Sequence, residues 1–271
     1  LKAHAPEIKQ ELAAAITSAL ESTQFINGPA VAAFEAQLAA YTEADYAVGC
    51  ASGTDALYLA LKALDIGAGD EVIAPTFTFV ATAEAIARCG ARPVFTDIDP
   101  HTFNIDPEKV KEAITPCTKA ILPVHLFGHA ADMDPIMEIA KEHGLKVIED
   151  NAQSLGGRYK GRPLGGIGDA GCHSFFPSKT LGAAGDGGAV IVKNLQAAQT
   201  ARTIRDHGAV KKYYSQIHGL NSRLDTIQAA YLRVKLRHLD TFIRQRNQVA
   251  EWYAQALAGV PITLPSVMEG C

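Results

Sequence analysis

The chain has 271 residues, 48% of them hydrophobic, and a formal net charge of −4 at pH 7. This composition is that of an ordinary globular protein, and the slight acidic excess provides no basic surface for nucleic acid. No stretch approaches the roughly 20 uninterrupted apolar residues that a membrane span needs, so we expect small molecules or other proteins as partners.

The five cysteines are scattered along the chain and form no Cys-x-x-Cys pair. An odd number without a pairing pattern indicates reduced thiols, as in a cytoplasmic protein. Cys50 and Cys172 lie in strand-like surroundings, where a small core residue is the expected role and a reactive thiol is the alternative. The histidines have no ligand-like spacing with cysteine or aspartate, so no metal site is expected.

Two helical patterns open the chain, at about 6–20 and 28–41, because apolar residues recur there three or four positions apart. Strand-like runs and helical patterns then alternate. Asp106 suits a helix N-cap, and Pro107 suits the first turn after it. Strands are expected at 46–50, 71–74, 92–96, 120–124, 146–150 and 189–192. Helices are expected at about 55–64, 79–88, from 106 onward, 133–143, 196–207 and 225–257.

The repeated strand–helix units predict an α/β fold, with a largely parallel sheet and helices on both of its faces. Ligands of such sheets bind outside the carboxyl ends of the strands. That rule singles out four groups of residues at strand ends, namely Ser52-Gly53-Thr54, Thr76 to Phe79, Asp150 to Gln153 and His173-Ser174.

A polar loop, 208–223, separates two of the later helical patterns and contains Lys211, Lys212, Tyr213 and Tyr214. These side chains suit a diphosphate and a base, and a mobile solvated loop is the equal alternative. The chain begins without a methionine and stops shortly after a further strand-like run, 260–264. We therefore expect a further domain beyond the given sequence.

A single amine, Lys179, stands in the run 173–188, which is largely aromatic, small or glycine-rich. Burial lowers the pKa of a lysine and frees its lone pair to attack a carbonyl, as a Schiff-base lysine must. The glycines of this run lack the spacing of a dinucleotide-binding loop, and they precede a strand. Lys179 is therefore the first candidate for a catalytic residue.

Three other strand ends offer groups that suit parts of one cofactor. Asp150 can hold a cationic ring nitrogen, as in pyridoxal-phosphate enzymes, or it can cap the next helix. The turn Gly53-Thr54 suits a phosphate at a helix N-terminus, or it is a plain capping sequence. Phe79 can stack on an aromatic ring or belong to the core. With Lys179, these residues provide a phosphate site, a stacking face, an acid and an amine.

These motifs, taken in order, resemble the DegT/DnrJ/EryC1/StrS family of nucleotide-sugar aminotransferases over essentially the whole chain. The residues that carry the resemblance are Gly53-Thr54-Asp55-Ala56-Leu57, Pro75 to Thr82, Glu149-Asp150-Asn151-Ala152-Gln153-Ser154, Ser174-Phe175-Phe176-Pro177-Ser178-Lys179, Gly185-Asp186-Gly187-Gly188 and Asn221-Ser222-Arg223-Leu224-Asp225.

The resemblance implies a fold type I enzyme that uses pyridoxal 5′-phosphate and works as a homodimer with sites shared across the interface. It divides the chain into a large cofactor-binding domain, 1–240, with a helical segment at 1–42, and a second part, 241–271. That second part is expected to be a linker helix and the start of a smaller C-terminal α/β domain, most of which is absent from this sequence.

The resemblance also assigns roles to single residues. Lys179 would bind the cofactor aldehyde and move protons, and Asp150 would pair with the pyridinium nitrogen. The remaining positions would contact the cofactor or the substrate. Gln153 would face the ring hydroxyl, Phe79 would stack on the ring, Gly53, Thr54 and Ser174 would hold the phosphate, Asn221 would reach the phosphate of the neighbouring subunit, and Arg223 would contact substrate across the dimer.

The implied reaction moves an amino group from an amino acid, usually glutamate in this family, to a keto-sugar on a nucleoside diphosphate. The motifs Phe175-Phe176-Pro177-Ser178-Lys179 and Gly185-Asp186-Gly187-Gly188 resemble members that aminate C3, including those acting on a UDP-linked 3-keto uronic acid. Such products belong to bacterial surface polysaccharide or amino-sugar synthesis. A sugar dehydratase of the same family, in which histidine replaces the lysine, and a non-catalytic regulator with the same fold are the alternatives.

Overall fold

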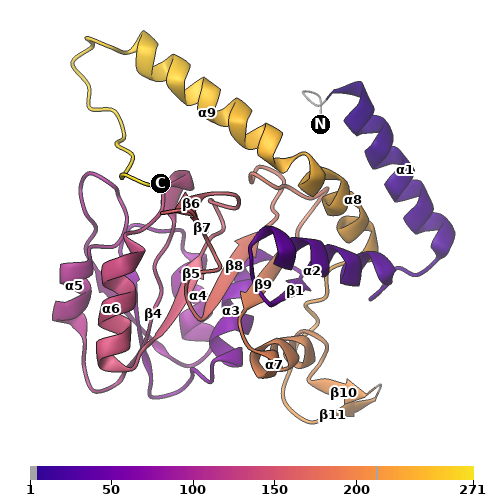
Figure 1. Ribbon diagram of the computed structural model, residues 1–271. Helices are drawn as coiled ribbons and strands as arrows, with labels where there is room; N and C mark the ends of the chain where they lie inside the picture. Colours follow the sequence, from indigo (N-terminus) through magenta and orange to yellow (C-terminus); the bar gives the residue numbers. More distant parts are fainter. Residues whose placement is uncertain (1–4, 212) are drawn as a thin grey trace.

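The computed structural model describes residues 5–211 and 213–271 (Figure 1). A seven-stranded sheet in the order β1-β9-β8-β5-β4-β2-β3 forms its centre. Only β9 of this sheet runs antiparallel to its neighbours, so the largely parallel sheet predicted from the sequence is confirmed. The strands are β1 (Tyr46–Cys50), β2 (Glu71–Pro75), β3 (Arg92–Thr96), β4 (Thr118–Ile121), β5 (Lys146–Asp150), β8 (Ala170–Ser174) and β9 (Gly188–Val192).

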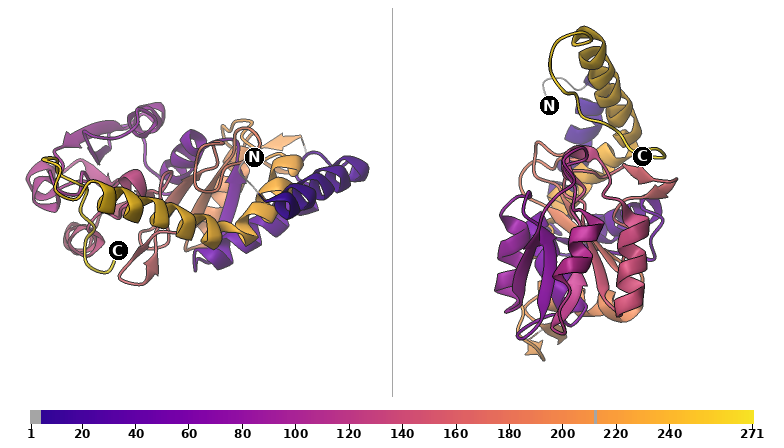
Figure 2. Two further views of the ribbon diagram at one scale, coloured as in Figure 1. Left: turned by 90° about the horizontal axis from the view of Figure 1, so that it is seen from above. Right: turned by 90° about the vertical axis from the view of Figure 1, so that its left-hand side faces the viewer.

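Helices cover both faces of the sheet, as the strand–helix alternation predicts (Figures 1 and 2). They are α1 (Pro6–Ser22), α2 (Pro29–Tyr41), α3 (Gly53–Ala63), α4 (Ala81–Arg88), α5 (Pro107–Ala113), α6 (Met133–His143), α7 (Leu195–Arg205), α8 (Thr226–Arg237) and α9 (Leu239–Ala256). The side chain of Asp106 accepts a hydrogen bond from the N–H of Glu108 at 2.9 Å, which confirms the predicted helix start at 106 and 107.

The strands supply two cores because successive side chains of a strand point to opposite faces. Ile148 of β5 packs with α3, α4 and α7 on one face. Val147 of the same strand packs with α5 and α6 on the other face, and Ile191 of β9 packs there with α2 and α8. Burial on both faces explains why β9 has a continuous apolar sequence.

Two expectations about helix and strand extent are wrong. The single helix expected at 225–257 is two helices, which meet at His238 (φ −101°, ψ 1°). α8 is largely buried, whereas only Leu239 of α9 is buried, and α9 projects away from the sheet (Figures 1 and 2). The strand expected at 260–264 does not form, because no described strand pairs with those residues.

Short irregular elements also differ from the expectations. β4 ends at Ile121 instead of 124, since Pro123 has no N–H to continue the ladder. A 3₁₀ turn, η1 (Leu126–Gly128), follows it. Two small hairpins were not predicted: β6 (Arg158–Tyr159) with β7 (Arg162–Pro163), and, inside the predicted loop 208–223, β10 (Ala209–Lys211) with β11 (Tyr214–Ser215). Lys212, which the sequence interpretation includes in the second loop, lies outside the described residues.

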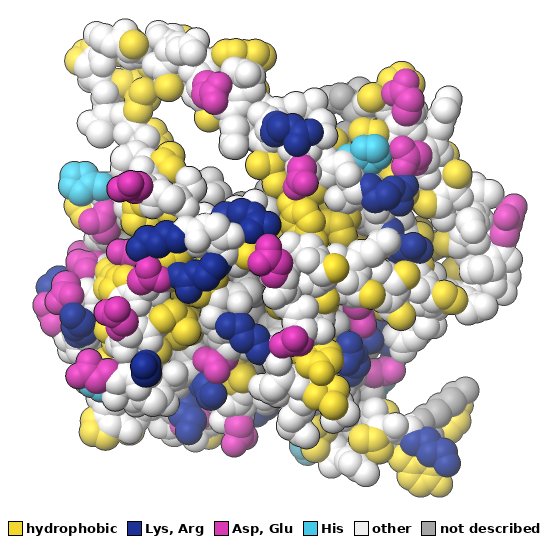
Figure 3. Space-filling view, viewed as in Figure 1, with side chains coloured by type: hydrophobic (Ala, Val, Ile, Leu, Met, Phe, Trp, Pro, Cys, Tyr) yellow, Lys and Arg dark blue, Asp and Glu magenta, His cyan; other side chains and the backbone are white. Residues whose placement is uncertain are grey.

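The surface agrees with the charge pattern of the sequence. On the face shown in Figure 3, lysine and arginine side chains are scattered among aspartates and glutamates and form no single basic patch. Within 5–211 and 213–271, no helix is both long and apolar enough to cross a membrane.

Candidate active site

Two of the predicted phosphate-binding residues meet where β1 and β8 end. A Cβ atom added to Gly53 would lie 2.6 Å from Cβ and 3.0 Å from Oγ of Ser174. Real Cβ atoms do not approach so closely, so glycine is required at position 53 for the first turn of α3 to touch the end of β8. The sequence interpretation gave Gly53 a role only in phosphate binding, and the structure adds its contact with Ser174.

The N-terminus of α3 has backbone donors to spare. The side chain of Ser52 caps the helix by accepting from the N–H of Asp55 at 3.1 Å. The N–H groups of Gly53 and Thr54 have no hydrogen-bond partner among the described residues. Free N–H groups at the positive end of a helix dipole bind phosphate well, so this turn can hold the phosphate of a cofactor. The capping alternative is also true, since Ser52 performs it.

Asp150 is a buried carboxylate at the end of β5. It accepts hydrogen bonds from the hydroxyl of Thr82 at 3.0 Å and from the N–H of Ala152 at 3.1 Å. Burial raises the pKa of Asp150, and these two bonds and the nearby charge of Lys179 oppose the rise only in part. No ion pair to Asp150 exists among the described residues. A buried charge of this kind fits a cationic ring nitrogen that the cofactor brings.

Lys179 lies in the turn that follows β8 and is half-buried. Its backbone N–H donates to the carbonyl of Phe176 at 2.9 Å. Its ammonium group has no hydrogen-bond or ion-pair partner in the described part of the chain. Since its charge acts on Asp150, the acid and the amine share one site. A Cβ atom at Gly182 would lie 2.3 Å from the carbonyl oxygen of Pro177, so this glycine lets the turn close.

Phe79 and Gln153 lie at the same carboxyl edge of the sheet. The side chain of Phe79 is 68% exposed, which excludes the core role and leaves its ring available for stacking. The side-chain oxygen of Gln153 accepts from the N–H of Phe127 at 2.8 Å. This bond holds the amide oxygen, and the NH₂ group can still donate to a ring hydroxyl.

Asn221 and Arg223 lie on a segment beside the end of β1. Ser222 anchors this segment, since its carbonyl accepts from the N–H of Ala51 at 3.1 Å. Asn221 is exposed, and Arg223 forms an ion pair with Asp206 at 2.5 Å. Within one subunit neither residue contacts Lys179 or Asp150, and their roles across a dimer remain predictions.

Two residues that contact or flank Asp150 were missed by the sequence interpretation. Thr82 follows Phe79 by one helical turn and is fully buried against Asp150. Glu149 precedes Asp150 and is fully buried with His125, at 2.9 Å between Glu149 Oε2 and His125 Nε2. A buried glutamate beside a site aspartate is an unusual pattern in a strand, and that was the available signal.

The sequence of this chain is similar to those of a known protein family and of named proteins. Residues 6–270 match the DegT/DnrJ/EryC1/StrS aminotransferase family. A Geobacillus stearothermophilus protein named pleiotropic regulatory protein is 49% identical over 97% of this chain and 72% of its own length. The UDP-N-acetyl-3-dehydro-α-D-glucosamine 3-aminotransferase of Acidithiobacillus ferrooxidans is 48% identical over 100% of this chain and 73% of its own.

The solved structure of DesV from Streptomyces venezuelae, in complex with a ketimine intermediate, superimposes on this chain with a TM-score of 0.95. The two sequences are 46% identical, and the match covers 97% of this chain and 71% of DesV. The α/β fold and its helical layers are therefore those of solved aminotransferases of this kind.

Proposed function

Because the chain belongs to the DegT/DnrJ/EryC1/StrS aminotransferase family, whose cofactor is pyridoxal phosphate, we propose that it moves an amino group from glutamate to a keto-sugar on a nucleoside diphosphate. The observation that carries the proposal is the buried, unpaired carboxylate of Asp150 with Lys179 beside it. Such a carboxylate is costly unless a cation joins it, and a pyridinium ring is that cation.

In this proposal, bound pyridoxal phosphate supplies a ring that withdraws electrons from the carbon next to the transferred nitrogen. Asp150 keeps the ring nitrogen protonated. Lys179 would hold the aldehyde carbon of the cofactor and, once released, would move a proton between the α-carbon of the amino donor and C4′ of the cofactor. Its half-buried position limits water around the amine, which keeps the proton between the reacting groups.

Other residues of this chain bind and orient the cofactor. The N–H groups of Gly53 and Thr54 and the hydroxyl of Ser174 bind the phosphate, Phe79 stacks on the ring, and Gln153 donates to the ring hydroxyl. Support for the phosphate site comes from the 2.6 Å approach that only glycine allows at position 53. Together these contacts fix the face of the ring on which Lys179 acts.

We further propose a homodimer in the cytoplasm, in which Asn221 binds the phosphate in the neighbouring subunit and Arg223 contacts its substrate. The exposure of Asn221 supports this assignment, since its side chain is not used within its own subunit. Arg223 has one nitrogen on Asp206, and its buried Nε has no partner among the described residues.

We propose C3 as the position of amination, in bacterial surface polysaccharide or amino-sugar synthesis. The relative from A. ferrooxidans acts, by its name, on a 3-dehydro sugar, and the motif Gly185-Asp186-Gly187-Gly188 supports the same position. A UDP-linked 3-keto uronic acid is one acceptor of this class.

A regulatory role is the second candidate, because the relative from G. stearothermophilus is named a regulatory protein. The complete set of Lys179, Asp150, Gln153 and Phe79 favours catalysis, since a regulator does not need a proton-moving amine. Lys179 also argues against a dehydratase, in which histidine stands at that position.

To test this, the purified protein is incubated with glutamate and with UDP- or dTDP-linked 3-keto and 4-keto sugars. The position of the new amino group on the product is then determined by NMR. We expect an amino sugar substituted at C3 and an equal amount of 2-oxoglutarate. Product at C4 would overturn the position, and no amino sugar from any acceptor would favour the regulator.

A further inference from the structure

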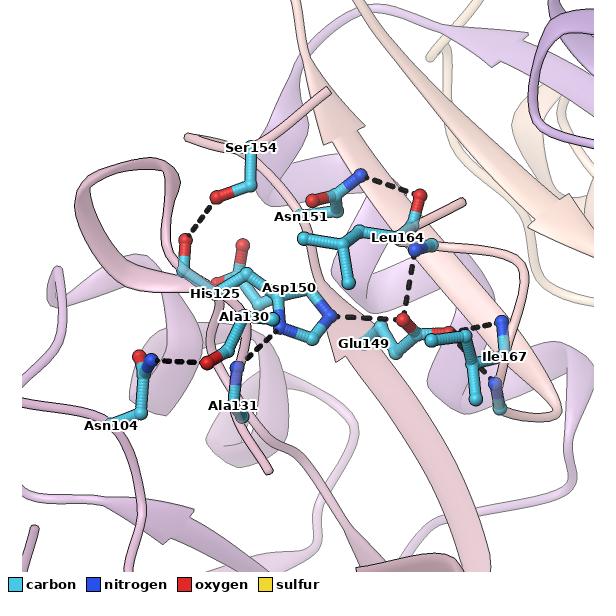
Figure 4. Close-up of polar contacts among 12 residues, drawn as sticks. Asn104, His125, Ala130, Ala131, Glu149, Asp150, Asn151, Ser154, Leu164 and Ile167 are labelled. Carbon is cyan, nitrogen blue, oxygen red and sulfur yellow. Dashed lines mark hydrogen bonds and ion pairs between the residues drawn. The ribbon is translucent and has the colours of Figure 1, made fainter. Parts of the chain in front are cut away.

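A buried polar cluster lies directly behind Asp150, on the opposite face of β5 (Figure 4). Its centre is Glu149, which is fully buried and accepts four hydrogen bonds. These come from His125 Nε2 at 2.9 Å and from the N–H groups of Gly165, Ile167 and Gly168 at 2.8, 2.7 and 2.7 Å. Four N–H donors occupy its two oxygens, which leaves no acceptor for a carboxyl proton, so Glu149 is ionised.

The position of the proton on His125 follows from its partners. The N–H of Ala131 donates to Nδ1 at 3.1 Å, so Nδ1 is an acceptor and carries no proton. The proton is therefore on Nε2, which donates to Glu149. His125 is neutral, and both of its ring nitrogens have partners. Glu149 and His125 thus carry one negative charge together and leave no buried donor unpaired.

The main chain of His125 is bonded to the segment that carries the site. Its N–H donates to the carbonyl of Asp150 at 3.0 Å, and its carbonyl accepts from the hydroxyl of Ser154 at 2.5 Å. Two residues later, the N–H of Phe127 donates to the side chain of Gln153 at 2.8 Å. Three hydrogen bonds therefore join the segments 125–127 and 150–154, and a shift of the His125 ring moves both segments.

We propose that Glu149 and His125 are a positioning pair that sets the place of Asp150 and Gln153 at the cofactor edge. The ring of His125 fixes residues 125–127 from one side, and Glu149 fixes the ring. Neither side chain reaches the carboxyl edge itself, so both act through other residues. This inference rests on the proposed function, because that function assigns Asp150 and Gln153 to the cofactor ring.

Glu149→Gln tests the pair with almost no change of shape. The amide NH₂ must take the place of one carboxylate oxygen, and each oxygen accepts from two donors. In one placement, the NH₂ group of the glutamine points at the N–H groups of Ile167 and Gly168. The other placement points the NH₂ group at the N–H of Gly165 and at His125 Nε2–H. A tautomer change that moves the His125 proton to Nδ1 relieves Nε2, but it then sets Nδ1–H against the N–H of Ala131. Both placements leave two donors opposed: the first displaces the loop 165–168, which holds the side chain of residue 149, and the second displaces the His125 ring, so the pair loses its fixed position in either case.

We expect Glu149→Gln to lower the unfolding temperature and to weaken binding of pyridoxal phosphate at least about tenfold. Val110→Ala is the control for stability alone, because Val110 is fully buried in α5 and its core cluster includes no residue of 125–127 or 150–154. It should lower the unfolding temperature and leave the affinity for pyridoxal phosphate unchanged. If Glu149→Gln loses stability as Val110→Ala does and keeps full affinity, the positioning role is overturned.

Two substitutions of His125 separate its two hydrogen bonds. His125→Gln can still donate from its amide nitrogen to Glu149, whereas His125→Asn can reach only the N–H of Ala131. The proposal predicts tighter binding of pyridoxal phosphate by the Gln variant than by the Asn variant. Equal affinities, or the reverse order, would contradict it, and this comparison carries the test if Glu149→Gln does not fold.

The protonation of His125 is measured without cofactor, by ¹⁵N NMR of histidine-labelled protein. The signal of His125 is the one lost in His125→Gln and kept in His143→Gln, since His143 is exposed on α6. We expect a neutral ring with its proton on Nε2. A proton on Nδ1, or on both nitrogens, would overturn the pair. If the unmodified protein binds no pyridoxal phosphate, the proposed function fails while this NMR result stands on its own.

Discussion

At the scale of the residue, the site depends on a carboxylate whose charge this chain does not neutralise. Asp150 is buried, its two hydrogen bonds come from neutral groups, and its pKa is raised. The folded protein without cofactor therefore binds a proton at Asp150 more tightly than the unfolded chain does. Stability from Asp150 is present below its ordinary pKa and is lost as the pH rises through the folded-state pKa. Under the proposed function, catalysis and stability therefore make opposite demands on Asp150.

Asp150→Asn should separate the effect of this residue on stability from its effect on activity. The amide can accept from the N–H of Ala152 and donate to Thr82, whose hydroxyl can turn toward Thr78, 2.9 Å away. We expect the variant without cofactor to unfold at the same or a higher temperature at pH 8, with a gap that closes toward pH 4. Its transaminase activity should fall at least about a hundredfold. Asp45→Asn, an exposed control, should change neither value; a marked loss of stability in Asp150→Asn would contradict this account.

His173 gives a second prediction at this scale. Burial lowers the pKa of His173 to about 4, since the charged ring is disfavoured inside β8. A depressed histidine pKa removes stability as the pH falls below about 6.5, by about 3 kcal/mol at most. Chemical denaturation between pH 7 and 4 should show this loss in the unmodified protein and in His143→Gln. A variant His173→Gln should lose less, and identical slopes in all three proteins would count against it.

At the scale of the element, the start of α3 and the end of β8 share one narrow contact. Gly53→Ala would place a methyl group 2.6 Å from Cβ of Ser174, so one element must shift. We expect a loss of roughly 1–3 kcal/mol in the free energy of unfolding, together with weaker binding of pyridoxal phosphate. Gly67→Ala is the matched control, because its nearest neighbour would be 3.6 Å away. The double variant Gly53→Ala with Ser174→Gly should recover stability, and no recovery would refute the contact.

The elements were predictable where local chemistry decides them. Asp106 and Pro107 identify the start of α5, and short apolar runs identify β1, β2, β3 and β5. The division of α8 from α9 at His238 has no such signal, since no proline or glycine marks it. It depends on where the core ends, which is a property of the packing. The hairpin of β10 and β11 includes Tyr213 at φ 69°. Tyrosine rarely adopts this conformation, so the sequence did not predict the turn.

At the scale of the whole molecule, the rule that ligands bind at the carboxyl ends of parallel strands identified the positions of Gly53, Asp150 and Ser174 without coordinates. The groups that hold them were not predictable in this way. Thr82 meets Asp150 across 68 positions, and Ser154 meets His125 across 29. Such contacts depend on register and helix placement, which a single sequence does not encode in its periodicity.

The proposed dimer can be tested by mixing inactive variants. Lys179→Ala removes the amine of its own site, and Arg223→Ala is expected to damage the site of the partner. Equal mixing after reversible dissociation makes half of the dimers mixed, and each mixed dimer keeps one intact site, so about a quarter of full activity should return. No recovery, with dimers shown by sedimentation, would place Arg223 in the site of its own subunit.

The central claim is that Lys179 binds pyridoxal phosphate and passes the amino group on, and absorbance measures this directly. Adding pyridoxal phosphate to the purified protein should produce visible absorbance, glutamate should remove it, and a UDP-linked 3-keto sugar should restore it. Lys179→Ala should give no lysine-bound absorbance, whereas Lys141→Ala, an exposed control on α6, should behave as the unmodified protein does. An unmodified protein that gains no visible absorbance with pyridoxal phosphate would contradict the account.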